Sequence, residues 1–182
     1  MPPHAQEIPV TQTIHGVTIS DNYRWLEDQN SPATRAWIAA EQKYTAEFFV
    51  SVPQREASKD KLAIFGTSNG GLLMGAAMTH RPNLFRVVVC GAPLLDMIRY
   101  QDFKIAKLWV PEYGSSDDPK QFTYLLKYSP YQHVETGMTY PAVLFWTGDN
   151  DTRVDPLHAR KMTALMQEES APGRPILIRY DT

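Results

Sequence analysis

The chain has 182 residues, a formal net charge of -2 and a pI of about 6.2. This length is enough for one domain with a core of its own, and a hydrophobic content of 43% suits a globular protein. The charge creates no basic field that would favour nucleic acid or an anionic membrane surface, so neither is expected as a partner. The single cysteine, Cys90, has no partner for an internal disulfide, and its apolar neighbours predict a buried strand thiol.

No targeting or membrane-spanning segment is expected. The N-terminal sequence MPPHAQEIPV has neither the basic start nor the apolar stretch of a signal peptide. The longest apolar run, Val87 to Leu95, is too short to cross a bilayer. The sequence therefore indicates a soluble, cytoplasmic protein, with a periplasmic parent as the alternative.

The elements are predicted in chain order as follows. Residues 1 to about 30 are expected to be irregular, and Ser31 and Pro32 suit the N-cap and first position of a helix that continues to about Val50. Apolar runs then predict strands at Leu62–Phe65, Phe85–Gly91, Ala142–Trp146 and Ile176–Tyr180. Helices are predicted from near Asn69 and from Pro156 to about Glu169, with irregular chain from Leu94 to Tyr140.

Strands that alternate with helices predict an α/β fold, in which a mainly parallel sheet is covered by helices in a three-layer arrangement. Functional residues in such a sheet lie in the loops at the C-terminal ends of the strands. One such loop holds Ser68. A second, TGDNDTRVDP, follows the strand at 142–146 and holds Asp149, Asp151, Arg153 and Asp155.

The segment AIFGTSNGG, residues 63–71, has the pattern of a nucleophile elbow, a sharp Gly-x-Ser-x-Gly turn between a strand and a helix. Ser68 would be the nucleophile, and the backbone amide of Asn69 would face the oxyanion. Glycine is expected at positions 66 and 70 because a side chain there would collide with the neighbouring strand or helix. The alternative is a glycine-rich turn whose serine has no catalytic role.

A serine nucleophile of this fold is followed along the chain by an acid and then by a histidine. Asp151 fits the acid, while Asp149 and Asp155 are alternatively solvated turn residues, and Asp155 resembles a helix start. None of the five histidines fits the base: His158 is interpreted as a partly exposed helix residue, and the others, His4, His15, His80 and His133, lie outside the expected loop.

Several segments together resemble the catalytic domain of prolyl oligopeptidases: GTSNGGLL, RPNLF, LLDMIRY, YSPY, YPAVLF, DTRV and PILIRYDT. IHGVTISDNYRWLED resembles the N-terminal segment that packs on that domain in the same family. The resemblance covers nearly the whole chain, and Thr67 departs from the family's usual glycine or arginine. It implies a partial α/β-hydrolase fold, with residues 1–60 as the N-terminal segment and residues 61–182 as the C-terminal half of the catalytic domain.

The resemblance implies a serine endopeptidase that cleaves short peptides after proline through an acyl-enzyme, with no metal or cofactor. It assigns Ser68 as nucleophile, Asn69 as oxyanion donor and Asp151 as the triad acid. The implied substrate contacts are Trp109, which would stack on the proline, its apolar neighbours Leu94, Tyr113 and Val154, and Arg153, which would bind a substrate carbonyl.

The chain also departs from the family. The family's β-propeller is expected between the N-terminal segment and the elbow strand, so a junction is predicted near Ser58 to Leu62, and the histidine loop is expected just beyond Thr182. The chain is therefore interpreted as an internally deleted, truncated and inactive relative. A non-catalytic interaction module is an alternative, and a small esterase of the same fold is disfavoured by Trp109 and Arg153.

Overall fold

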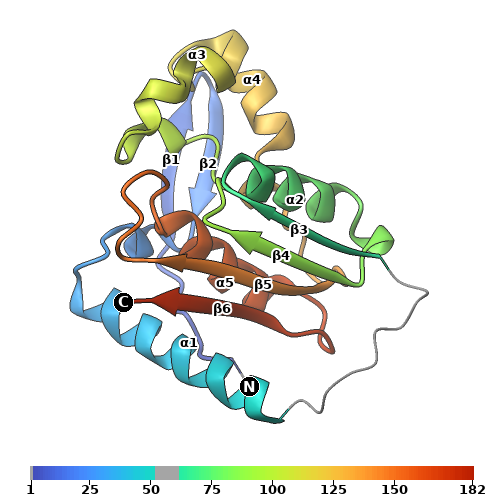
Figure 1. Cartoon of the computed structure of the whole chain (residues 1–182). Helices are drawn as coiled ribbons and strands as arrows, with labels where there is room; N and C mark the ends of the chain where they lie inside the picture. Colours follow the sequence, from blue (N-terminus) through green and yellow to red (C-terminus); the bar gives the residue numbers. More distant parts are fainter. Residues whose placement is uncertain (1, 52–61) are drawn as a thin grey trace.

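The computed structural model describes residues 2–51 and 62–182. Its centre is a four-stranded parallel sheet in the order β3-β4-β5-β6 (Figure 1). The strands are β3 (Ala63–Thr67), β4 (Val87–Gly91), β5 (Ala142–Gly148) and β6 (Ile176–Asp181). The predicted α/β fold class is confirmed, and the free thiol of Cys90 is buried in β4 as expected. Most of the predicted junction, positions 58–61, lies outside the described residues.

Three long helices pack on the sheet. α2 (Asn69–His80) lies against β3 and β4, and α5 (Leu157–Glu169) lies against β5 and β6. α1 (Pro32–Ser51) runs along β6 (Figure 1), where Gln42 Nε2 and Thr45 Oγ1 donate to the carbonyl oxygens of Tyr180 and Ile178 at 2.5 and 2.8 Å. α1 thereby occupies two backbone carbonyl groups at this edge of the sheet and covers the edge strand. None of the described helices combines the length and apolar character needed to cross a bilayer.

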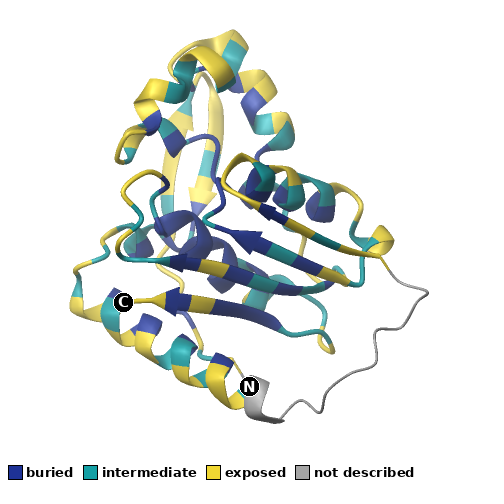
Figure 2. Ribbon diagram, viewed as in Figure 1, coloured by how far each residue is buried: buried dark blue, intermediate teal, exposed yellow. Residues whose placement is uncertain are grey.

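The prediction that residues 1 to about 30 are irregular is wrong. They contain an antiparallel hairpin, β1 (Val10–Ile14) and β2 (Val17–Asp21), followed by a 3-10 helix at Arg24–Glu27. The hairpin turn is His15-Gly16, and both residues have positive φ, 51° and 81°, which is the geometry of a tight two-residue turn. Most of the hairpin is exposed (Figure 2), so its strands lack the buried apolar pattern that would have predicted them.

The stretch from Leu94 to Tyr140 is not irregular, which is a second correction. It contains α3 (Val110–Tyr113), α4 (Pro119–Tyr128) and 3-10 helices at Tyr100–Asp102, Ala106–Trp109 and Pro130–His133, while another 3-10 turn, Pro82–Leu84, precedes β4. α4 begins where the carboxylate of Asp118 accepts from the amides of Lys120 and Gln121 at 2.8 and 2.9 Å. This acidic N-cap followed by proline is a sufficient local cause for the helix.

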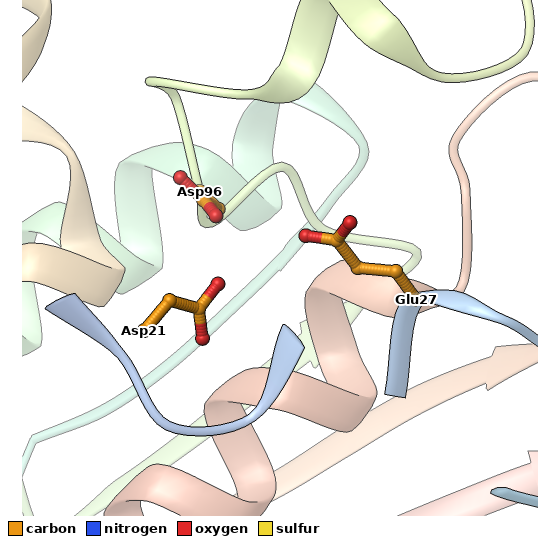
Figure 3. A group of neighbouring side chains, drawn as sticks. All are labelled: Asp21, Glu27 and Asp96. Carbon is orange, nitrogen blue, oxygen red and sulfur yellow. The ribbon is translucent and has the colours of Figure 1, made fainter. Parts of the chain in front are cut away.

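A buried lysine joins the N-terminal segment to the rest of the molecule. The ammonium of Lys161, on α5, is 0% exposed and lies 2.6 Å from Asp21, 2.7 Å from Asp96 and 3.2 Å from Glu27. Figure 3 shows these three carboxylates converging from separate segments, with oxygens within 4.8 Å of one another. The cation among them is the lysine itself. Burial alone would lower the pKa of Lys161, but the three carboxylates together raise it.

The first prediction concerns this cluster. Lys161→Met should lower the free energy of unfolding by about 3–5 kcal/mol, because it leaves buried carboxylates without their counter-charge. Urea unfolding followed by circular dichroism measures the change. Lys43→Met is the matched control, since Lys43 is 78% exposed and forms a weak surface ion pair with Glu47 at 3.9 Å. The expected loss of unfolding free energy in this variant is under about 0.5 kcal/mol. Equal losses in the two variants would show that the buried ion cluster has no special role in stability.

A second buried charge lies between α1 and α5. Glu41 is 0% exposed, and its Oε2 accepts from Gln167 Nε2 at 3.1 Å. Its Oε1 has no hydrogen-bond partner among the described residues. Burial raises the pKa of Glu41 to about 7, and the hydrogen bond from Gln167 offsets only part of that effect. The carboxyl group therefore stays protonated in the folded state well above its ordinary range.

This raised pKa predicts a pH-dependent stability. The unfolded carboxyl titrates near 4.5 and the folded one near 7, so the contribution of Glu41 to stability is complete below pH 4.5 and is lost as the pH rises through 7. Glu41→Gln should exceed the parent in stability by about 1–3 kcal/mol above that range, and the difference should disappear in acid. Glu47→Gln, on the exposed side of α1, should leave the pH profile unchanged. A parallel profile for Glu41→Gln and the parent would contradict the assignment.

Candidate active site

Ser68 lies in a sharp turn between β3, which ends at Thr67, and α2, which begins at Asn69. Its backbone has φ 55° and ψ -120°, a region that a residue with a side chain adopts only under strain. The amide of Ser68 donates to the Gly91 carbonyl at 2.8 Å, and its own carbonyl accepts from Leu72 at 3.1 Å. These bonds hold the strained turn in place. The predicted strand–turn–helix position of Ser68 is confirmed, and its side chain is exposed.

The glycines around the turn differ in what they allow. A Cβ at Gly66 would lie 2.3 Å from the carbonyl oxygen of Gly70, so only glycine fits there. A Cβ at Gly70 would have no heavy atom within 4 Å, so the predicted collision at this position is wrong. Gly71 takes that role instead, because a Cβ there would come within 2.7 Å of Pro93. Close packing of α2 thus depends on positions 66 and 71.

Asp151 lies in the loop between β5 and α5. Since β3 and β5 are parallel members of one sheet, Ser68 and Asp151 follow strands that end at the same edge, as predicted. Asp151 Oδ1 accepts from the amides of Arg153 and Val154, both at 2.9 Å. Lys104 Nζ donates to the Asp151 carbonyl oxygen. Among the described residues no hydrogen bond reaches Oδ2 of Asp151, so this oxygen is available to a donor.

The two neighbouring aspartates have structural roles. Asp149 accepts from Arg35 at 2.6 Å and from the Tyr180 hydroxyl at 2.8 Å. Burial alone would raise the pKa of Asp149, but the hydrogen bonds from Arg35 and Tyr180 lower it. Its side chain is only 20% exposed, so the alternative of a solvated turn residue is wrong for Asp149. Asp155 accepts from the amide of Leu157, the first residue of α5, at 2.9 Å, and Pro156 is the N-cap, so the helix begins next to the predicted Asp155-Pro156 start.

A cavity of about 370 Å³ opens at the C-terminal ends of the strands. Its acidic residues are Asp151 and Asp181, and Trp146, 42% exposed, contributes an aromatic ring. Trp146 Nε1 donates to Asp181 Oδ2 at 2.8 Å. The described residues that line it are Thr67, Gly91, Ala92, Trp146, Thr147, Gly148, Asn150, Asp151 and Asp181. Among the described residues, the wall of this cavity therefore has carboxylates and no basic side chain.

None of the five histidines lines this cavity. His158 is 1% exposed, which corrects the expectation of a partly exposed residue. Its Nδ1 accepts from the amides of Leu95 and Asp96 at 3.4 and 3.1 Å, and burial lowers its pKa to about 4. The ring is thus a neutral part of the core. The other histidines contact Glu168 (His4), the Ser116 carbonyl (His15) and each other (His80 and His133).

The structure brings four of the predicted substrate-contact residues into one apolar cluster. Leu94 and Val154 are 2% and 3% exposed, and Trp109 and Tyr113 are partly buried against the same cluster. Arg153 is exposed in the loop beside Val154. Asn69 is the first residue of α2, so its backbone N–H has no acceptor within the helix. Sequence patterns did not indicate that Lys104 or the Trp146–Asp181 pair belongs to the site, because only the tertiary fold brings these residues to the sheet edge that holds Asp151.

Residues 21–182 match the model of the prolyl oligopeptidase family. The chain belongs to this family. It is 45% identical over 126 residues to a prolyl endopeptidase of Elizabethkingia miricola, which covers 69% of this chain and 18% of that protein. It is 41% identical over 133 residues to a prolyl endopeptidase of Dictyostelium discoideum, covering 71% and 18%. The chain thus spans 18% of the length of these curated relatives.

Solved structures agree with the family assignment. A prolyl endopeptidase aligns with a TM-score of 0.65 and 38% identity, covering 90% of this chain and 25% of its own. A post-proline cleaving enzyme from Rickettsia typhi aligns with a TM-score of 0.64 and 30% identity, covering 88% and 23%. At this identity the match supports the α/β-hydrolase fold of a prolyl oligopeptidase catalytic domain.

The elbow geometry predicts opposite outcomes for two nearby glycines. Gly66→Ala should lower the free energy of unfolding by more than about 2 kcal/mol, because the new methyl group meets backbone atoms that cannot move away. Gly70→Ala should be neutral or should stabilise α2 by up to about 1 kcal/mol, as alanine generally does in a helix. Thermal and urea unfolding of the two variants tests this. A larger loss in Gly70→Ala would contradict the described turn.

Proposed function

We propose that this chain carries the nucleophile and the acid of a serine-type endopeptidase that hydrolyses short peptides after proline. The observation that supports it most is the strained backbone of Ser68, held at the same sheet edge as Asp151. Strain at a non-glycine residue persists only where the surroundings enforce it, and it concentrates at functional sites. The family relationship supports this substrate class, since relatives of this chain are named prolyl endopeptidases.

The proposed chemistry begins with attack of Ser68 Oγ on the peptide carbonyl carbon, which gives an acyl-enzyme that water then hydrolyses. The free N–H of Asn69, at the N-terminus of α2, is suited to the developing oxyanion. Asp151 has a free Oδ2 that would accept the N–H of a base and fix its tautomer. A further proposal concerns the organisation of the chain: residues 1–60 form the N-terminal segment that packs on the catalytic domain, and residues 61–182 form the C-terminal half of that domain.

Proline selectivity is proposed to come from the apolar cluster near this edge. A flat indole such as Trp109 packs well on a pyrrolidine ring. Leu94, Val154 and Tyr113 provide an apolar surface around it, and Leu94 and Val154 are held rigidly by burial. Arg153, exposed and carrying fixed N–H donors, is proposed to bind a carbonyl of the substrate.

A second function is favoured by one observation, the position of the histidines. None of them lines the cavity beside Asp151, so no histidine of the described residues stands where a base for Ser68 is expected. A peptide-binding module that recognises proline without cleaving the peptide is the corresponding candidate. Such a module would bind proline on the apolar cluster and would not require a catalytic triad.

Peptide binding tests the substrate class without requiring catalysis. A short peptide with an internal Gly-Pro pair should bind more tightly than its Gly-Ala counterpart, measured by isothermal titration calorimetry. Trp109→Ala should lower the affinity for the Gly-Pro peptide about tenfold and abolish its preference over the Gly-Ala peptide, as expected for the loss of ring stacking. Trp25→Ala is the control, since Trp25 packs in the other core cluster and donates to the Gln6 carbonyl at 2.8 Å. Equal affinity for both peptides would refute proline recognition at this cluster.

A further inference from the structure

Two histidine rings meet at the surface of the molecule, outside the candidate active site. The centroids of the His80 and His133 rings are 4.6 Å apart, and the ring planes are tilted by 52°. His80 is the last residue of α2, and His133 is the last residue of the 3-10 helix Pro130–His133. His80 is exposed and His133 is half-buried. The pair therefore joins two separate elements at a position that small ions in solution can reach.

The two elements that carry these rings are packed closely against each other. A Cβ at Gly75, in the middle of α2, would lie 3.0 Å from Cγ of Pro130, so the helix approaches Pro130 as closely as a glycine allows. Ser129, which precedes the 3-10 helix, is buried, and its hydroxyl accepts from the Met97 amide at 2.8 Å. The packing of helical elements, which position side chains more precisely than loops do, thus sets the separation of the two rings.

One hydrogen bond fixes the tautomer of the His133 ring. Its Nδ1 lies 3.0 Å from the carbonyl oxygen of Ser129. Because a carbonyl oxygen only accepts, Nδ1 of the neutral ring carries the proton and Nε2 keeps a free lone pair. Metal-binding histidines usually donate their second nitrogen to a backbone carbonyl or a carboxylate in this way. Among the described residues no hydrogen bond reaches Nε2 of His133 or either ring nitrogen of His80.

The spacing of the rings suits a single metal ion between them. Imidazole nitrogens bind transition metals at about 2.0–2.1 Å, which places the centroids of two rings on one ion roughly 4.5–5.5 Å apart. The observed 4.6 Å is at the short end of this range and corresponds to an angle of about 90° at the metal, as in tetragonal coordination. The exposed His80 ring can rotate until one of its nitrogens faces the same ion as Nε2 of His133.

The end of α2 also favours a cation. The last carbonyl groups of a helix form the negative end of its dipole, and His80 lies in the last turn of α2. In the part of the chain that the structure describes, neither His80 nor His133 forms an ion pair with a carboxylate that would hold its ring elsewhere. Arg81, the next residue, is exposed, so water and salt screen its charge.

We propose that His80 and His133 form a binding site for a divalent transition-metal ion, with Cu²⁺ preferred over Zn²⁺ and water in the remaining coordination positions. Imidazole nitrogens select these ions over Mg²⁺ and Ca²⁺, which prefer oxygen ligands. The bound ion links the end of α2 to the segment that follows α4. It stabilises the folded chain, because the unfolded chain does not hold the two rings together.

This site is separate from the candidate active site. Ser68 precedes the first residue of α2 and His80 is the last, so the twelve residues of the helix lie between them. A helix of that length spans about 18 Å. The inference therefore goes beyond the proposed peptidase function, and neither depends on the outcome of the other's test.

Calorimetric titration of the tag-free chain with Cu²⁺ and with Zn²⁺ tests the site. The chain should bind one equivalent of either ion, Cu²⁺ more tightly, and should not bind Mg²⁺ in the same concentration range. His80→Phe is the decisive variant, because it keeps an aromatic ring against His133 and removes the metal ligand. This variant and His133→Gln should each bind both ions at least about tenfold more weakly. His4→Ala, which removes a single exposed histidine beside Glu168, should bind like the parent.

Two further measurements separate metal binding from ring packing, and circular dichroism confirms that each variant is folded. The electron paramagnetic resonance spectrum of bound Cu²⁺ should show coupling to two imidazole nitrogens in the parent. Zn²⁺ should raise the Tm of the parent and leave that of His80→Phe unchanged. Binding of one equivalent that depends on both histidines supports the inference. Binding that persists in either variant, that falls equally in His4→Ala, or that is absent from the parent overturns it.

Discussion

The fold depends on one buried cation, the ammonium group of Lys161. Lys161 neutralises carboxylates from β2, the first 3-10 helix and the segment after β4, so one ammonium connects three parts of the chain. Arg160, also 0% exposed, donates to the Leu26 carbonyl at 2.9 Å and to the Tyr180 hydroxyl at 2.8 Å. Charged groups are costly to bury unless each is paired, so this network tolerates few alternative arrangements of the N-terminal segment. The segment shares one core with the sheet: Tyr23 and Leu26 belong to the same buried cluster as residues of α2, β5 and β6.

How much of the fold was predictable depended on local signals. The strands of the parallel sheet are short apolar runs between turns, and such runs are visible in any sequence of this class. The start of α1 was predictable from Ser31, whose hydroxyl accepts from the Thr34 amide at 3.1 Å. The N-terminal hairpin gave no comparable signal, since its strands are mostly exposed and are placed by the contact of Asp21 with Lys161. α4 had a start signal at Asp118 and helical spacing of Phe122, Leu125 and Leu126. These signals cover only ten residues of a long stretch that otherwise forms short helical turns.

The candidate site was predictable where a motif is contiguous and not where tertiary contacts decide. The position of Ser68 followed from its glycine-flanked turn, and that of Asp151 followed from the rule that parallel strands end at one edge. Their catalytic roles, and the roles of the substrate-contact residues, stay predictions. The burial of His158 depends on amides from a distant loop. No periodicity encodes such a contact, and the same holds for the cavity wall, where Trp146 meets Asp181 only because β5 and β6 are adjacent.

The attachment of α1 to β6 also has a consequence for the order in which the molecule is made. Gln42 and Thr45 bond to residues 138 and 133 positions later in the chain, and Arg160 reaches back 134 positions to Leu26. During synthesis the hairpin and α1 leave the ribosome well before α5 and β6, which carry these partners. Contacts between residues so far apart in sequence slow folding, because the entropy of closing a long loop is lost before the contacts can stabilise the fold. The hairpin and α1 therefore cannot form their final contacts until β6 has been synthesised.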